Sequence, residues 1–342
     1  MSIKRPEDTV YIVTGVSGFI GFEIADQLCK EGYATRGLIR KINPITPFPK
    51  ELELIKGDLL DIDSLEKLYH DTKDKKTVMI HSAAYLSVKK NDPNCEHINI
   101  QGTKNIIEIC KKYSSKLVYI SSVDTLDNSQ QLVKEPDSFN PDIHFTSYAR
   151  SKAIASQLVL DEIQKGLDGV IILPSAVAGP NDYRKGFIYD MLSIYLNGIT
   201  LFSIKGGYDF VDVRDVAKAT ITAALTDTPN KSYIISNKYA DITEIYCMIA
   251  DYLNIPKPKV KLPLWALYAA IPFMRIWCKI NKKECPLSSS AIKIMGQFPN
   301  YSNERAKKDL GFSPRPLNDT FKDTIDFIIS QKKLTGNHKG KK

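Results

Sequence analysis

Short runs of β-branched and aliphatic residues alternate with amphipathic stretches along the first half of the chain. Strands are expected at 9–14, 34–39, 52–56, 78–81, 117–120 and 170–173, and helices at 19–30, 62–69, 95–113 and 148–164. In the first helical stretch, Ile20, Ile24 and Leu28 recur at helical spacing, and in the last we expect Ala153, Leu158 and Ile163 to be buried. The run 170–173 has no polar residue, which is typical of a strand covered on both faces. The alternation predicts an α/β fold with a doubly wound parallel sheet.

The pattern becomes less regular after Pro174. One strand is expected at 232–235, with helices near 243–253 and 317–329. We interpret this half as a smaller, mostly helical lobe packed over the carboxyl edge of the sheet. The predicted organisation is a first lobe over 8–175, a second lobe over 176–330 interleaved with the first, and a disordered basic tail over 331–342.

Composition and charge narrow the function classes. The chain has 342 residues with 43% hydrophobic and 25% charged side chains, as in an ordinary soluble protein. Its formal net charge is +8, but five lysines lie after Asp326, where no acidic residue follows, so the folded body carries only about +3. No basic stripe of the kind that binds nucleic acid is evident. The tail is either a solubilising end or a weak attachment to an anionic surface.

Cysteine use and the first residues bear on the compartment. The six cysteines form no C-x-x-C pair and have no histidine pair nearby at zinc spacing, so we expect no metal site and a reducing compartment. Residues 1–8 are charged and lack the apolar core of a signal peptide. These features favour a cytoplasmic protein.

The segment 262–278 (LPLWALYAAIPFMRIWC) is unusually apolar. Pro263, Pro272 and Arg275 interrupt it, and it is shorter than the roughly 20 apolar residues that a membrane-spanning helix needs. Two alternatives remain. It is a buried or substrate-covering helix, or it is a helix that lines an apolar substrate pocket or lies on a membrane surface. In the last case the protein would contact a membrane peripherally.

Glycines stand at 15, 18 and 21 where the first strand gives way to the first helix, in the segment TGVSGFIG. Gly15 suits the positive φ of a tight turn, and Gly18 lets a pyrophosphate approach the backbone. Gly21 lets the helix pack closely. The free N–H groups at the start of this helix, from Gly18 through Phe19 and Ile20, favour phosphate. In a strand–turn–helix context the pattern predicts a dinucleotide site.

Residues after the second and third strands would contact the adenosine end. NAD-binding proteins of this architecture usually carry an acidic residue after the second strand, but Arg40 stands there. A guanidinium pairs with a 2′-phosphate, so we favour NADP as the cofactor, with NAD as the alternative. Asp58, beside Leu59, is placed to accept from the adenine amino group or to cap the following turn.

Tyr148 and Lys152 lie four positions apart at the start of a predicted helix, which puts both on one face. A tyrosine hydroxyl ionises near pH 10, and an adjacent ammonium together with a cationic nicotinamide would lower its pKa toward neutrality. Tyr148 could then exchange a proton with a carbonyl or alcohol. Ser122 ends the fifth strand, where its hydroxyl either holds the substrate oxygen or satisfies local backbone groups.

These segments together resemble the extended short-chain dehydrogenase/reductase family of the epimerase/dehydratase type, over about residues 8–330. The resemblance rests on TGVSGFIG, GDLLD, IHSAA, INIQGTKN, VYISSV, YARSK and DFVDVRDVAKA. It implies a Rossmann lobe, a nicotinamide cofactor and a catalytic set of Ser122, Tyr148 and Lys152 supported by Asn99. It further implies that Ala83, Pro174 and Ser175 contact the cofactor. A homodimer is common in this family.

Within the family, the chain resembles dihydroflavonol reductases and 3β-hydroxysteroid dehydrogenases. Nucleotide-sugar enzymes usually carry an arginine just before the Asp-Phe pair of the segment DFVDVRDVAKA, where this chain has Tyr208. We therefore expect hydride transfer between NADP(H) and a ketone or secondary alcohol on a largely apolar small-molecule substrate. Two alternatives stay open: a nucleotide-sugar epimerase or dehydratase with bound NAD, and a non-catalytic NADP-sensing regulator.

Overall fold

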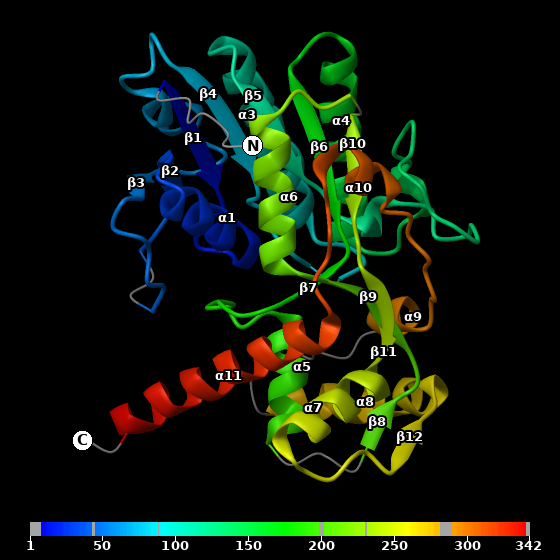
Figure 1. Cartoon of the computed structure of the whole chain (residues 1–342). Coiled ribbons are helices and arrows are strands. Elements are labelled where there is room, and N and C mark those ends of the chain that lie inside the picture. Colours follow the sequence, from blue (N-terminus) through cyan, green and yellow to red (C-terminus); the bar gives the residue numbers. More distant parts are fainter. Residues whose placement is uncertain are drawn as a thin grey trace.

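A seven-stranded parallel sheet forms the centre of the protein (Figure 1). The computed structural model describes residues 8–42, 45–87, 89–197, 202–229, 231–280 and 289–339. The strands are β1 (Thr9–Thr14), β2 (Ala34–Ile39), β3 (Glu53–Lys56), β4 (Lys76–His81), β5 (Lys116–Ile120), β6 (Gly169–Pro174) and β10 (Ser232–Ile235), in the order β10-β6-β5-β4-β1-β2-β3. The order reverses between β1 and β4, which opens a crevice at their carboxyl ends. The predicted Rossmann sheet is confirmed.

Helices cover both faces of this sheet, as Figure 1 shows. The helices are α1 (Phe19–Lys30), α6 (Val213–Leu225) and α10 (Glu304–Leu310) on one face, and α2 (Ile62–Glu66), α3 (Pro93–Lys112) and α4 (Ser147–Gln164) on the other. The predicted helix over 62–69 ends at Glu66 and continues as a 3-10 turn over Lys67–Tyr69. In α4, Ala153 is buried as expected, but Leu158 and Ile163 are only half-buried, because Val159 and Leu160 face the sheet instead.

The second lobe has its own core. It contains the three-stranded sheet β11-β9-β7, with β7 (Ala176–Ala178), β9 (Gly207–Asp212) and β11 (Lys238–Asp241), packed against α5 (Phe187–Leu196), α7 (Ile242–Leu253) and α11 (Leu317–Lys339). A smaller unit holds the paired strands β8 (Phe202–Ile204) and β12 (Val260–Leu262) with α8 (Leu264–Ile280) and α9 (Ser289–Met295). Between these elements the chain returns to the central sheet as β10, so the lobes are interleaved.

The C-terminal helix is longer than the sequence led us to expect. Helix α11 runs to Lys339, whereas the predicted disordered tail began at 331. No proline stops the helix after Leu317, and Lys332 Nζ donates a hydrogen bond to Asn197 Oδ1 at 2.9 Å. Residues 340–342 of the predicted tail lie outside the described residues.

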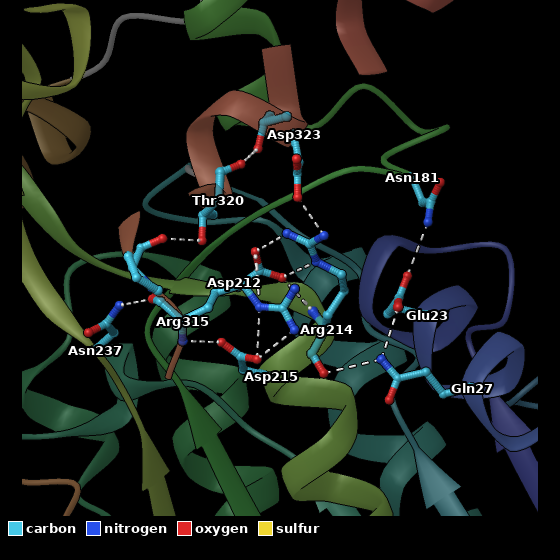
Figure 2. A network of polar contacts seen from close by, with 12 residues as sticks. Glu23, Gln27, Asn181, Asp212, Arg214, Asp215, Asn237, Arg315, Thr320 and Asp323 are labelled. Atoms are coloured by element: carbon cyan, nitrogen blue, oxygen red, sulfur yellow. Dashed lines mark hydrogen bonds and ion pairs between the residues drawn. The ribbon is translucent and has the colours of Figure 1, made fainter. Parts of the chain in front are cut away.

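A partly buried network of charged side chains joins α11 to the start of α6 (Figure 2). Asp212 is fully buried and accepts two hydrogen bonds from Arg214, at 2.9 and 2.7 Å. The guanidinium of Arg214 also donates to Asp323 on α11 at 2.6 Å. Arg315, just before α11, donates to Asp215 on α6 at 2.9 Å. Because paired charges stay satisfied only in one geometry, the network sets the position of the second lobe against the sheet.

Candidate active site

A cavity of about 810 Å³ lies at the carboxyl edge of the central sheet, between the two lobes. Predicted site residues that line it are Gly15, Gly18, Phe19, Arg40, Asp58, Leu59, Ala83, Ser122 and Ser175. Ile20, Gly21, Asn99, Tyr148, Lys152 and Pro174 do not line the cavity in this structure. The second lobe contributes Phe187 and the chain around Tyr208 and Tyr301. One cavity therefore holds the predicted phosphate loop and the predicted catalytic serine.

The glycine turn has the close packing that its sequence predicts. Gly15 has φ +77°, as expected for the turn, and a Cβ there would lie 2.7 Å from the backbone nitrogen of Ala83. A Cβ on Gly21 would lie 2.3 Å from the carbonyl oxygen of Gly15. Gly18 begins α1 and its N–H donates to Gly15 O at 2.8 Å. The first turn of α1 therefore meets the cavity through glycine, which fits a phosphate group at the helix start.

An arginine from the second lobe contacts this turn. Arg184 Nε donates to the carbonyl oxygen of Ser17 at 2.9 Å, and Arg184 Nη2 donates to the Ser17 hydroxyl at 2.7 Å. Arg184 also lines the cavity. The loop that carries it is held against α1, because Asn181 Nδ2 donates to Glu23 Oε2 at 3.2 Å (Figure 2). Sequence reasoning missed Arg184, since 167 positions separate it from Ser17 and no motif connects them.

At the predicted adenosine end, Arg40 is exposed and lines the rim of the cavity. Asp58 Oδ1 accepts a hydrogen bond from the N–H of Leu60 at 2.9 Å, so the carboxylate supports its own turn. Asp58 also lines the cavity, which leaves its adenine role as a prediction. Leu59 is held in place because Asn105 Nδ2 donates to its carbonyl oxygen at 2.8 Å.

Asn99 is buried on α3 and braces the segment after β4. Its Oδ1 accepts from the N–H of Tyr85 at 2.7 Å, and its Nδ2 donates to the carbonyl oxygen of Tyr85 at 3.0 Å and to the Ser151 hydroxyl at 2.9 Å. The amide thus connects the wall of the cavity at Tyr85 to α4 at Ser151. This geometry suits the supporting role that the resemblance implies for Asn99.

The two serines that end β5 face different surroundings. The hydroxyl of Ser121 is buried against the hydroxyl of Ser156, with their oxygens 2.6 Å apart. Ser122 lines the cavity, and its hydroxyl accepts from the N–H of Asp124 at 3.1 Å. The hydroxyl therefore satisfies a local backbone group, and its role in holding a substrate oxygen stays a prediction.

Lys152 is buried beneath the end of β5. Its Nζ donates to the carbonyl oxygen of Ile120 at 2.6 Å and lies 4.1 Å from the ring centroid of Tyr119. Burial lowers the pKa of Lys152 to about 7, well below that of an exposed lysine. The nearby His81 is buried between Thr14 and Thr103, and burial lowers its pKa to about 3, so this imidazole is neutral.

Tyr148 lies at the start of α4, outside the cavity lining, and its pKa in the structure without cofactor is not lowered. Its pKa is raised rather than lowered, first by burial and then by the carboxyl of Asp124 and the thiol of Cys95. In the structure without cofactor, Lys152 Nζ is hydrogen-bonded to Ile120 O. The predicted depression included the charge of a bound nicotinamide, so for the complete site it stays a prediction. A lower pKa would need the positive charge of an oxidised nicotinamide ring.

Asp124 is a site residue that sequence reasoning missed. Its carboxyl lines the cavity two positions after Ser122, and burial raises its pKa. The same carboxyl acts on the pKa of Tyr148 and of Tyr208, so it lies between the two lobes. The only sequence signal was its place just after a strand end, where side chains of parallel sheets meet the ligand crevice.

Ser175 places a buried hydroxyl at the cavity. The Ser175 side chain is 6% exposed, and its hydroxyl lies beside the carboxyl of Asp209, whose pKa it lowers against the larger effect of burial. Ser175 lines the cavity just after β6, whereas Pro174 lies behind it in the sheet, paired with Ile235. The glycine turn and Ser175 line the same cavity, so the residues present fit a bound dinucleotide.

Replacing Lys152 with Met is expected to change how stability depends on pH. The pKa of Lys152 is about 7 in the folded protein and about 10.4 in an unfolded chain, so between these values the unfolded chain binds the extra proton. The unfolding free energy of the wild type, relative to Lys152→Met, should rise by roughly 3 kcal/mol from pH 6.5 to pH 9.5. Urea denaturation of both proteins without cofactor measures this difference in unfolding free energy. The exposed Lys218 supplies the control Lys218→Met, and an equal difference at both pH values would contradict the assignment.

Comparisons with known proteins agree with this geometry. The profile described as the NAD dependent epimerase/dehydratase family matches residues 11–236. A putative dihydroflavonol 4-reductase of Synechocystis sp. is 26% identical over 333 residues, covering 93% of this chain and 94% of that protein. The sterol-4-alpha-carboxylate 3-dehydrogenase erg26 of Schizosaccharomyces pombe is 28% identical over 226 residues, covering 64% of each chain.

Solved structures share the fold over almost the whole chain. The crystal structure of gox2253 matches with a TM-score of 0.79 and 25% identity, covering 95% of this chain and 98% of that one. The Bordetella bronchiseptica enzyme WbmH, solved in complex with NAD+, matches with a TM-score of 0.70 and 22% identity, covering 94% of this chain and 99% of that one. The second likeness concerns the fold alone.

Proposed function

Since this chain belongs to the NAD dependent epimerase/dehydratase family, we propose that it transfers a hydride between NADP(H) and a ketone or secondary alcohol on a largely apolar substrate. The chain is an enzyme of this family and an oxidoreductase by membership. The observation that carries the proposal is that one cavity is lined by the glycine turn, by Ser122 and by the aromatic side chains of Phe187 and Tyr208.

A bound nicotinamide would supply or accept the hydride. In the direction of reduction, the hydroxyl of Tyr148 donates a proton to the substrate oxygen as the hydride reaches the carbon, which leaves an alcohol and a phenolate. Ser122 donates a hydrogen bond that orients the same oxygen. Lys152 lies one helical turn from Tyr148, where its charge stabilises the phenolate that forms.

Aromatic side chains of the second lobe support the proposed substrate class. Tyr208 packs edge-on against Phe187 and Phe210, with ring centroids 6.0 and 5.9 Å away. These rings supply an apolar wall where a nucleotide-sugar enzyme would offer a guanidinium to a diphosphate. The relatives named for sterol and dihydroflavonol chemistry support a ring-containing ketone.

The test is a two-step assay on the purified protein. Fluorescence titration with NADPH and NADH measures cofactor affinity. The oxidation of the reduced cofactor is then followed with ketosteroids, flavonoid-like ketones and small aldehydes. We expect turnover with at least one multi-ring ketone and none with the aldehydes. Cofactor binding without turnover on any ketone would contradict the proposal and favour a sensing role.

A second candidate is a nucleotide-sugar epimerase or dehydratase with retained NAD, and Arg184 favours it. This guanidinium lies at the cavity rim beside the glycine turn and could contact a substrate diphosphate in place of the missing arginine at Tyr208. Protein that is purified with bound NAD and turns over a nucleotide sugar without added cofactor would support this candidate.

Arg40 should decide the cofactor preference. Arg40→Asp is expected to weaken NADPH binding by roughly 30-fold, because it replaces a charge-assisted contact to the 2′-phosphate with a repulsive one. NADH affinity should change less than threefold. Lys41, also exposed but not lining the cavity, supplies the control Lys41→Asp. If both variants lose NADPH affinity equally, the effect comes from the overall electrostatic field of the protein, and the assignment of Arg40 to the 2′-phosphate is wrong.

A further inference from the structure

Helix α8 has one buried face and one exposed apolar face. Leu267 and Ile271 pack with Ile292 and Met295 of α9 in a small core. The opposite face is exposed at Trp265 (71%), Phe273 (75%), Ile276 (60%) and Ile280 (74%). Their spacing places them on one side of a helix, together with the exposed Tyr268. Scattered surface hydrophobics are ordinary, but a continuous row of large ones marks a contact surface.

The sequence that contains α8 is rich in basic residues. Between Asp251 and Glu284 it has seven lysine and arginine residues and no aspartate or glutamate. Of the lysines that precede α8, Lys257 pairs with Asp251 and Lys261 with Asp241, and Lys259 is exposed. The net charge of the whole chain is +8, so the seven basic residues of this stretch account for nearly all of it. Lys259 is exposed just before β12, which leads into α8.

We propose that the exposed face of α8, with the lysines that precede it, docks on the surface of a bilayer that contains anionic phospholipids. Aromatic and aliphatic side chains on one face, flanked by basic residues, are the pattern of a helix that lies in the interface. No helix in the described part of the chain is long and apolar enough to cross a membrane.

A second copy of the chain is the other occupant to consider, and the charges disfavour it. In a symmetric dimer the same surface meets itself, so this lysine-rich stretch would face its own copy. Like charges placed across an interface oppose association. An anionic lipid surface offers the complementary charge and accepts the apolar side chains as well.

The docking face belongs to the unit that forms one wall of the cavity. The core between α8 and α9 also contacts Tyr208, which lines the cavity, and Gln297 and Pro299 line it just after α9. Membrane contact would therefore take place next to the cavity. The docking does not depend on the proposed hydride transfer and can be tested without substrate.

The test is co-sedimentation of the full chain with vesicles. One set is phosphatidylcholine alone, and the other contains about 30 mol% phosphatidylserine. We expect binding to the anionic vesicles at about 0.1 M salt that weakens at least fivefold at about 0.5 M, because salt screens exposed charges. Trp265→Ser combined with Phe273→Ser should weaken binding at least tenfold, and Lys259→Glu about threefold.

Control variants test whether vesicle binding depends on the exposed face of α8 or on any exposed apolar or basic residue. Ile194 and Leu132 are exposed apolar residues elsewhere, so Ile194→Ser with Leu132→Ser should bind like the wild type. Lys73 is an exposed lysine of the first lobe, and Lys73→Glu should also leave binding unchanged. Circular dichroism and thermal melts of every variant confirm that each is folded. Absence of wild-type binding to anionic vesicles, or equal binding by the Trp265/Phe273 variant, would overturn the proposal.

Tryptophan fluorescence provides an independent measurement. The chain has two tryptophans, so Trp277→Phe leaves Trp265 as the only reporter. Its emission should shift to shorter wavelength on anionic vesicles and be quenched by brominated lipid. Light scattering without lipid tests whether a second copy of the chain binds this face instead. A wild-type dimer that the Trp265/Phe273 variant dissociates, with no vesicle binding, would assign the face to a second copy.

Discussion

Replacing Tyr148 with Phe is expected to lower turnover at least about 1000-fold while dinucleotide affinity changes less than about threefold. The variant keeps the ring and loses only the proton that the substrate oxygen needs. Because the Tyr148 pKa is raised by burial and by Asp124, the hydroxyl is protonated at neutral pH. It is therefore ready to act as the acid in the direction of reduction.

The measurement is steady-state turnover with the ketone found in the substrate screen, alongside NADPH titration. Tyr113, which stacks on Tyr69 with ring centroids 4.2 Å apart, supplies the control Tyr113→Phe, whose turnover should match the wild type. Turnover of Tyr148→Phe within tenfold of the wild type would remove Tyr148 from the reaction. Loss of NADPH affinity in that variant would instead indicate a binding role.

Replacing Gly21 with Ala is expected to abolish measurable dinucleotide binding and to lower the unfolding free energy by about 3 kcal/mol. The added Cβ would lie 2.3 Å from Gly15 O and 2.7 Å from the Gly15 carbonyl carbon. Both atoms are backbone, so the clash is relieved only if α1 moves away from the turn. That movement would displace the N–H groups at the start of α1 from the phosphate position.

Gly311 provides the matched control, because it has φ +60° and open space around it. Gly311→Ala carries backbone strain without a clash, so it should cost about 1 kcal/mol of stability and leave dinucleotide binding intact. Urea denaturation and NADPH titration measure both variants. A Gly21→Ala protein that binds NADPH like the wild type would contradict the role given to this turn.

The pKa values of Lys152 and Asp124 are shifted by burial, which sequence motifs do not predict. Lys152 contacts the carbonyl oxygen of Ile120 and the Tyr119 ring, and burial lowers its pKa to about 7. Asp124 has a raised pKa, and its carboxyl raises the pKa of Tyr148 further. Such shifts depend on how much water each group loses on folding and on which charges come close. Neither quantity can be obtained from the spacing of Tyr148 and Lys152.

What the sequence alone determined is local. Alternating apolar runs predicted the parallel sheet, and the spacing of Gly15, Gly18 and Gly21 predicted the turn, because a strand, a helix and a tight bend depend on neighbouring residues. The tertiary structure alone decided the contact of Arg184 with Ser17 and the direction of the Tyr148 pKa. It also decided which face of α8 is exposed. These features arise between segments far apart in the chain, where packing sets distance and burial, and no local pattern encodes either.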